Sequence, residues 1–254
     1  MQFNSYLFLL LFLPAVLAGY FGLCRMKRHT WARGFLAAMS LVFFAYANPW
    51  YLGLLVGSAV FNWAVSRMLV RDGSRGTDTG HGGADSGPGR GQGRKLLLIS
   101  GIFANLALLF YFKYMNFFIE NLNAFLGKDI AFTRLLLPVG ISFFTFQQIA
   151  WLVDSFRMET EGYGFWDYFL FTVYFPKIAM GPILLHGEFI PQLREPRRRK
   201  ADSGHLAEGL MILAVGLFKK VILAEFFAGP VNWGFAQVEI LSSTDAFLVM
   251  TAYT

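Results

Sequence analysis

The stretch YFPKIAMGPILLHGEFIPQL, residues 174–193, decides how this chain must fold. It is largely apolar, yet Pro176 and Gly181-Pro182 interrupt any continuous helix through it. Backbone groups freed by proline cannot face lipid, because each unsatisfied group there costs several kcal/mol. The segment from Tyr168 to Leu185 is also barely long enough to cross a bilayer. The sequence therefore predicts a broken, re-entrant element that lies inside protein or lines a cavity.

Composition around this stretch is that of a membrane protein. Hydrophobic residues make up 56% of the chain, aromatic residues 18% and charged residues only 15%, and the mean hydropathy is +0.48. Soluble domains carry about 25% charged residues. We therefore expect an all-α fold, a polytopic transmembrane helical bundle. The net charge of +6 arises from short basic segments between apolar runs, which indicates membrane topology and not nucleic-acid binding.

Residues 1–70 are expected to form about three transmembrane helices. Residues 3–23 carry no charge, and the basic residues follow this run, which is the reverse of a signal peptide. The 24–33 loop is then cytoplasmic. The apolar region 34–66 is interrupted by Asn48-Pro49, which predicts two helices joined by a tight turn.

Residues 71–94 differ sharply in composition, with nine glycines among 24 residues. Such a segment buries too little apolar surface to offset its ordering entropy, so we expect a flexible cytoplasmic linker. His81 within it is interpreted as a solvated loop histidine. The lone cysteine, Cys24, excludes an intramolecular disulfide and a multi-cysteine metal site.

Residues 95–254 form the expected membrane core. A span at 96–118 is followed by an interfacial helix or loop at 119–134. The run Leu135–Phe156 carries polar residues that should face the protein interior, and Asp154 is placed to pair with Arg157 one helical turn away.

The remaining segments complete the expected topology. The basic run 194–200 should lie on the same side as Arg157, which a re-entrant hairpin achieves and a full crossing does not. Residues 206–229 predict another helix, with Lys219 and Lys220 at an interface or a polar interior. The last apolar segment begins near Thr244 and rises only about 17 Å, about half the membrane core, so the core is expected to be incomplete at its C-terminal end.

Three blocks of the sequence resemble the membrane-bound O-acyltransferase (MBOAT) superfamily, in particular its alginate O-acetyltransferase-like branch. They are residues 137–157, 174–193 and 209–228, and they occur in that family's order. The resemblance implies transfer of an acyl group, commonly acetyl, to hydroxyls of an exported polysaccharide such as alginate. It implies no bound cofactor, a donor such as acetyl-CoA or another acyl thioester, and a multi-pass location in a bacterial inner membrane. The implied partners are membrane lipid, the polysaccharide acceptor, and periplasmic or membrane proteins of polysaccharide modification, with no nucleic acid.

The family's catalytic histidine lies beyond the last block in this chain, so the resemblance implies only the N-terminal part of such an enzyme. None of His29, His81, His186 or His205 maps onto that histidine, and we predict no catalytic residue here. For His186 we favour a role at the rim of the passage over general base catalysis. No metal ligands are expected. The candidates for lining a substrate path are Gln147, Pro176, Lys177, Gly181, Pro182, His186 and Glu188.

Two functions of different class stay open at the level of sequence. The chain is either a truncated O-acyltransferase or a non-enzymatic membrane component of a polysaccharide export or modification complex, acting as a scaffold or a transporter-like protein. For Gln147 we favour interhelical hydrogen bonding over lining the acyl path. We interpret Pro176, Gly181 and Pro182 as architectural residues that shape the cavity without contacting substrate.

Overall fold

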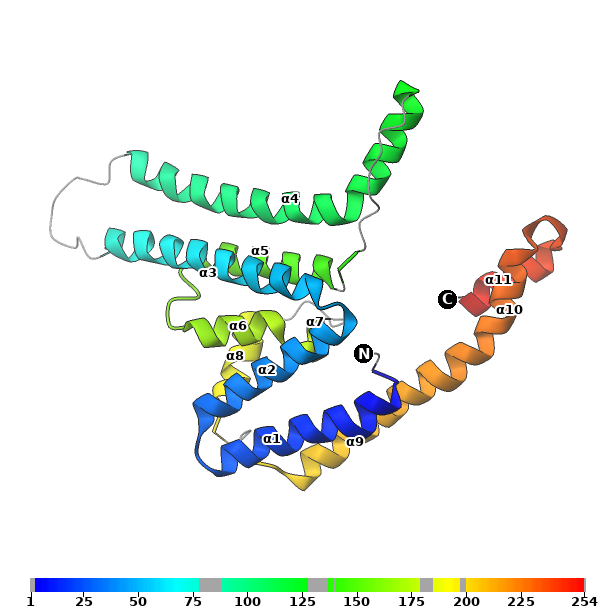
Figure 1. Ribbon diagram of the computed structural model, residues 1–254, viewed down its shortest axis with the longest axis horizontal. Helices are drawn as coiled ribbons and strands as arrows, with labels where there is room; N and C mark the ends of the chain where they lie inside the picture. Colours follow the sequence, from blue (N-terminus) through cyan, green and yellow to red (C-terminus); the bar gives the residue numbers. More distant parts are fainter. Residues whose placement is uncertain are drawn as a thin grey trace. The chain divides into compact units, whose positions relative to one another are not determined.

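The computed structural model describes residues 3–77, 88–127, 137–138, 140–178, 185–196 and 200–253. Throughout these residues the regular structure is helical, with no strand, which confirms the all-α expectation (Figure 1). The chain divides into two compact units, one of Pro14–Arg199 and one that combines Gln2–Leu13 with Lys200–Thr254.

Eight α-helices belong to the described part of the first unit. In chain order they are α1 (Leu13–Arg25), α2 (His29–Ala47), α3 (Trp50–Thr77), α4 (Pro88–Leu126), α5 (Ile141–Phe156), α6 (Phe165–Val173), α7 (Phe175–Ile178) and α8 (His186–Arg194).

Three helical stretches in the described residues are long and apolar enough to cross a membrane. They are Leu7–Arg25, Trp50–Ser74 and Gly91–Leu126. The helix α4 has 39 residues and rises about 58 Å, nearly twice the roughly 30 Å hydrocarbon core. It bends toward its C-terminal end (Figure 1). The protein is therefore an all-helical membrane protein.

The helices α3, α4 and α5 pack together around buried polar groups. The carboxamide oxygen of Gln148 in α5 accepts hydrogen bonds from Ser58 at 2.8 Å and Asn62 at 3.0 Å, both in α3. Asn62 and the α4 residue Asn105 exchange side-chain hydrogen bonds at 2.6 and 3.1 Å. Gln148, Asn62 and Asn105 are all buried. This confirms that α5 turns polar side chains inward, although Gln148 Nε2 and the Thr145 hydroxyl have no hydrogen-bond partner among the described residues.

A second polar chain joins α3 to the end of α5. The indole N–H of Trp151 donates to the Ser66 hydroxyl at 2.9 Å, and the hydroxyls of Ser66 and Ser155 lie 2.7 Å apart. The Thr160 hydroxyl donates to Ser155 at 2.9 Å. Because all four residues are buried, these bonds fix the loop after α5 against α3.

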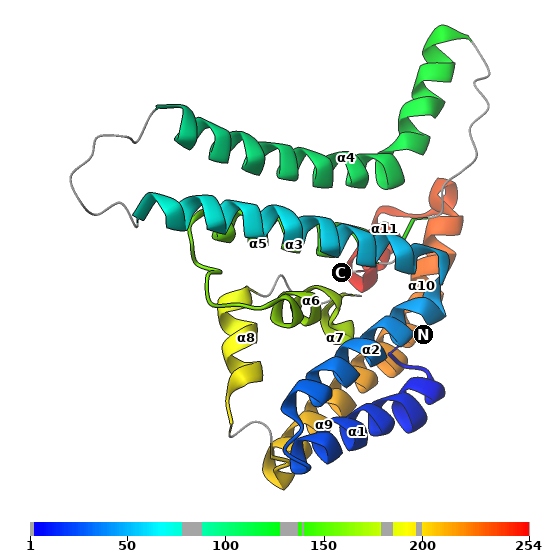
Figure 2. The ribbon, with the colours of Figure 1, turned by 60° about the vertical axis from the view of Figure 1, so that its left-hand side comes forward.

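The proline-broken segment begins where expected. The helix α6 ends at Val173, and Tyr174 leaves helical geometry with φ −56° and ψ 112° just before α7. The backbone N–H of Phe175 donates to the Ser40 hydroxyl of α2 at 3.3 Å, and Phe175 is buried. The backbone at Phe175 is thus shielded by protein, whereas Pro176 is exposed and residues 179–184 lie outside the described residues. The helix α6 lies between α2 on one side and α3 and α5 on the other (Figures 1 and 2).

The second unit contains η1 (Leu7–Phe12), α9 (Ser203–Leu217), η3 (Phe218–Leu223), α10 (Ala224–Ala236), η4 (Val238–Ile240) and α11 (Ser243–Tyr253). Lys219 and Lys220 lie in the wider π-helical turn η3 and are exposed. The helices α10 and α11 pack closely at Gly234, where an added Cβ would lie 2.4 Å from a methyl group of Val249. Gly234 therefore lets the two helices approach.

Residues 119–126 form the end of α4, so helix is the alternative observed there, and 128–134 lie outside the described residues. Two expectations from the sequence differ from the structure. Helix α3 continues through residues 71–77 and α4 already covers 88–94, so helix occupies both ends of the glycine-rich stretch, and residues 78–87 lie outside the described residues. Asp154 pairs with His186 and not with Arg157.

Candidate functional site

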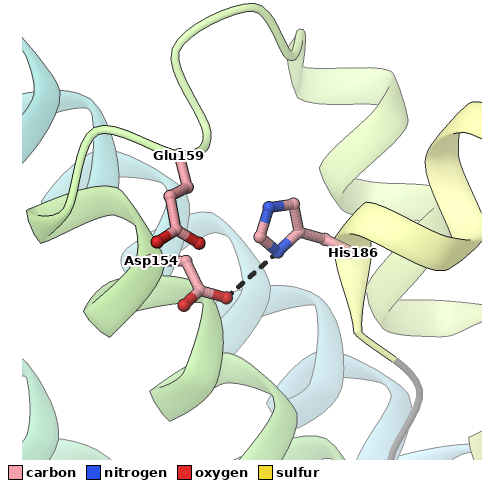
Figure 3. A group of neighbouring side chains, drawn as sticks. All are labelled: Asp154, Glu159 and His186. Carbon is pink, nitrogen blue, oxygen red and sulfur yellow. Dashed lines mark ion pairs between the residues drawn. The ribbon is translucent and has the colours of Figure 1, made fainter.

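Three side chains that can hold protons or metal ions meet at one end of α5 (Figure 3). They are Asp154, Glu159 and His186, and their ligand atoms all lie within 4.8 Å of one another. Nδ1 of His186 lies 3.0 Å from Oδ2 of Asp154. Asp154 belongs to α5, Glu159 to the turn that follows it, and His186 is the first residue of α8. Segments about 30 residues apart in the sequence thus form one cluster.

Aromatic rings hold His186 in place. The ring of Trp151 lies 5.3 Å from the imidazole, and that of Tyr163 lies 5.6 Å away, both approaching edge to face. His186 is only 7% exposed. The extended backbone of Leu185 turns the chain into α8 at this point, which directs the imidazole toward α5. Packing therefore leaves the ring little freedom to rotate.

The turn after α5 brings Glu159 beside Asp154. Met158 adopts left-handed backbone geometry with φ +68°, a conformation that few non-glycine residues adopt. The backbone N–H of Glu159 then donates to the carbonyl of Asp154 at 2.9 Å. As a result two carboxylates of like charge lie next to one another.

A second ionic group lies at the start of α6. Both oxygens of Asp167 are used: Oδ1 is 2.9 Å from Arg33 of α2, and Oδ2 is 2.6 Å from Arg194 of α8. The N–H of Gly164 also donates to Oδ2, at 3.2 Å. Burial alone would raise the pKa of the Asp167 carboxyl, but the bonds from Arg194 and Gly164 and the charges of Arg194 and Arg33 more than offset this and lower the pKa. The ionised carboxylate of Asp167 thus links α6 to α2 and α8 through two ion pairs.

A cavity of about 850 Å³ opens next to this region. It is lined by residues of α3, including Arg67 and Arg71, and by the 161–164 loop with Tyr163. Tyr163 also contacts the ring of His186. Tyr163 therefore lies between the cavity and the carboxylate-histidine cluster and contacts both.

The structure places the expected path-lining residues in different surroundings. Gln147 is buried and donates to the Phe171 carbonyl at 2.8 Å. Lys177 is buried, with Nζ 3.5 Å from the centre of the Phe171 ring and no hydrogen-bond partner within the described residues. Pro176 and Glu188 are exposed.

Of the seven candidates, only His186 joins the Asp154–Glu159 cluster. Gly181 and Pro182 lie outside the described residues, as does His81. His205 is exposed and pairs with Asp202 at 2.8 Å.

Sequence reasoning missed Glu159 and Asp167. The cationic partners of Asp167 are distant in sequence, since Arg33 lies 134 residues away, and Glu159 reaches the cluster through an unusual turn. The one available signal was the placement of single acidic residues at the ends of apolar runs, on the side predicted to be basic. Such residues commonly pair with cations.

The cluster can position a proton. A histidine whose Nδ1 is held by a carboxylate presents Nε2 as its free nitrogen, and the carboxylate stabilises the ring when it is charged. The same three side chains also comprise one imidazole and two carboxylates, which are ligands for divalent transition metals.

Comparison with known proteins shows which proteins are similar to this chain in sequence. The chain is 33% identical over 278 residues to a peptidoglycan O-acetyltransferase of Helicobacter pylori, an alignment that covers 99% of this chain and 50% of the relative. It is 32% identical over 259 residues to a probable alginate O-acetylase AlgI of Pseudomonas aeruginosa, covering 100% of this chain and 45% of the relative. The corresponding protein of Azotobacter vinelandii is 31% identical, with 47% of its length covered. No family model and no solved structure matches the chain.

Essentially the whole chain is thus similar to proteins named as O-acetyltransferases and O-acetylases, in agreement with the resemblance of three sequence blocks to the alginate O-acetyltransferase-like branch of the MBOAT superfamily. The chain spans about half the length of the curated relatives it matches.

Proposed function

We propose that this chain is part of a membrane-bound O-acyltransferase that transfers acetyl groups to hydroxyls of an exported polysaccharide. The observation that supports this is the similarity of essentially the whole chain to proteins named for O-acetylation. The donor we propose is acetyl-CoA or another acyl thioester on the cytoplasmic side. In the reaction the carbonyl–sulfur bond breaks, a carbonyl–oxygen bond forms, and the hydroxyl proton leaves with the thiol.

The physical demands of this reaction suit a helical membrane protein with buried polar groups. A sugar hydroxyl is a weak nucleophile, so a positioned base must accept its proton, and water must be kept from the thioester. The packing of α3, α4 and α5 around buried polar groups supports the proposal, and shielded backbone such as that of Phe175 can border a passage without facing lipid.

We propose that the base is supplied by a segment outside this chain, as the family resemblance implies. His186 then acts at the rim of the passage, held by Asp154. The chain alone is expected to be inactive. The acceptor is an envelope or secreted polysaccharide of the kind for which the relatives are named, peptidoglycan or alginate. We place the protein as a multi-pass protein of the bacterial inner membrane, working with other proteins of polysaccharide modification.

The test is complementation in a bacterium that has lost its own polysaccharide O-acetylation gene. The chain is expressed alone, and in parallel with the remaining half of a relative such as the P. aeruginosa protein. Ester-bound acetate is released from the exported polysaccharide by mild base and quantified. We expect acetate at the vector background for the chain alone, and well above it when both halves are present.

The exposed His205→Ala variant serves as the matched control and should restore acetylation as well as the unchanged chain. Acetylation by the chain alone would refute the proposal that its base lies elsewhere. Absence of acetylation in the two-part cells, with both parts present in the membrane, would favour the alternative of a non-enzymatic scaffold or transporter-like component.

A further inference from the structure

The cluster of Asp154, Glu159 and His186 has the composition of a metal site. Within the described residues it is the one group of three such side chains whose ligand atoms lie within 4.8 Å of one another (Figure 3). The figure shows all three side chains directed toward a common point. One of them is a buried imidazole, so this is not simply a patch of surface carboxylates.

The distances suit a small divalent ion. Two ligands on one tetrahedral zinc, each bound at about 2.0–2.1 Å, lie roughly 3.3 Å apart. Nδ1 of His186 and Oδ2 of Asp154 are already 3.0 Å apart. Glu159 is exposed, so its side chain is free to rotate the remaining distance. Only the Glu159 side chain therefore has to move for the three residues to bind one ion.

Charge also favours a divalent occupant. Asp154 and Glu159 bring two carboxylates together beside the imidazole of His186. A divalent cation at their meeting point is attracted by both carboxylates at short range.

The ligand types select among divalent ions. Imidazole suits zinc and its transition-metal neighbours, whereas magnesium and calcium prefer oxygen ligands only. We propose that Asp154, Glu159 and His186 bind one divalent transition-metal ion of the zinc class. The ion links the turn after α5 to the first residue of α8, and so fixes the chain where it leaves the proline-broken segment.

The experiment measures zinc binding by the 254-residue chain in lipid nanodiscs. After removal of metal with EDTA, the protein is titrated with Zn²⁺ in competition with a fluorescent chelator, and bound zinc is counted by mass spectrometry after dialysis. We expect one saturable Zn²⁺ per chain, unaffected by millimolar Mg²⁺. X-ray absorption of the bound ion should show one imidazole among oxygen ligands.

Two variants and one control localise the site. His186→Gln and Glu159→Gln should each weaken zinc binding by at least about tenfold, the lower end of what loss of even an outer-sphere partner causes. Because Glu159 is exposed, its variant tests the site without disturbing the core. The control His205→Gln removes a histidine that also pairs with an aspartate but is exposed, and it should bind zinc as the unchanged chain does.

Absence of saturable zinc binding by the unchanged chain would overturn the proposal. Unchanged affinity in Glu159→Gln, or displacement of zinc by magnesium, would overturn it as well. These outcomes do not depend on acyl transfer, so they can be distinguished from failure of the proposed function.

Discussion

Replacing Asp167 by asparagine should loosen the joint between α2, α6 and α8. The carboxylate accepts bonds from Arg33 and Arg194, and bonds to a charged group contribute about 1.5–3 kcal/mol each. Arg33 is 27% exposed and Arg194 41% exposed, so water screens both and the lower end of that range applies. The asparagine oxygen still accepts one bond. We therefore expect Asp167→Asn to lower the free energy of unfolding by about 2 kcal/mol.

The assay is thermal unfolding of the purified protein in detergent, followed by intrinsic fluorescence. For a chain of this size about 2 kcal/mol corresponds to a fall in Tm of roughly 4–8 °C. The matched control is Asp202→Asn, which breaks the exposed pair with His205 and should change Tm by less than about 2 °C. An Asp167→Asn protein that melts with the control would refute the reasoning.

Lowering the pH should remove the contribution of the Asp167 carboxylate to the free energy of unfolding. The pKa of Asp167 is lower in the folded protein than the value of about 3.9 in an unfolded chain. The carboxylate therefore contributes its full stabilisation above about pH 4, and loses it as the pH falls through the lowered pKa. The Tm difference between the unchanged protein and Asp167→Asn should be constant from pH 7 to 5 and shrink below about pH 4.

Three further substitutions test the packing. Gly234→Ala should lower Tm, because its Cβ would meet Val249 at 2.4 Å and overpacking costs about 1–3 kcal/mol. Gln148→Leu should lower the free energy of unfolding by about 1–3 kcal/mol, because the half-buried Ser58 and the buried Asn62 lose their acceptor. Lys177→Met should leave Tm unchanged or raise it, because the buried Nζ of Lys177 has no hydrogen-bond partner in the described residues.

Each of these has an outcome that contradicts it. Gly229→Ala, also in α10 but with open space at its Cβ, is the control for Gly234 and should be neutral or mildly stabilising. Equal melting of the two alanine variants would show that α10 and α11 do not pack as described. A Tm unaffected by Gln148→Leu would argue against the polar network. A fall of several degrees in Lys177→Met would show that contacts of Nζ such as that with the Phe171 ring stabilise the fold.

The sequence predicted those features of the fold that follow from local pattern. Apolar composition correctly predicted helices, and the polar residues of α5 correctly predicted its buried face. The helix α6 ends before Tyr174, close to the predicted break at Pro176. The boundaries near the glycine-rich stretch were wrong, because an established helix extends through glycines at a cost of only about 1 kcal/mol each. The local residue pattern therefore does not predict the residue at which a long helix ends.

The candidate site was less predictable because its partners are distant in sequence. Spacing paired Asp154 with Arg157, one turn away, whereas the fold brings His186 from α8 to the same carboxylate. The left-handed backbone of Met158 positions Glu159, but it could not be predicted because this conformation is usually adopted by glycine. Such contacts depend on which helices become neighbours, and single-chain periodicity does not specify that.

The buried amides of α3, α4 and α5 bear on how the protein enters the membrane during synthesis. Asn62 and Asn105 bond to each other directly, so a hairpin of α3 and α4 can leave the insertion machinery with its polar side chains already matched. Gln148 arrives only with α5, and its oxygen then accepts from Asn62. Biogenesis is thus expected to proceed in two stages, with the α3–α4 hairpin forming a docking template for the helix made after it.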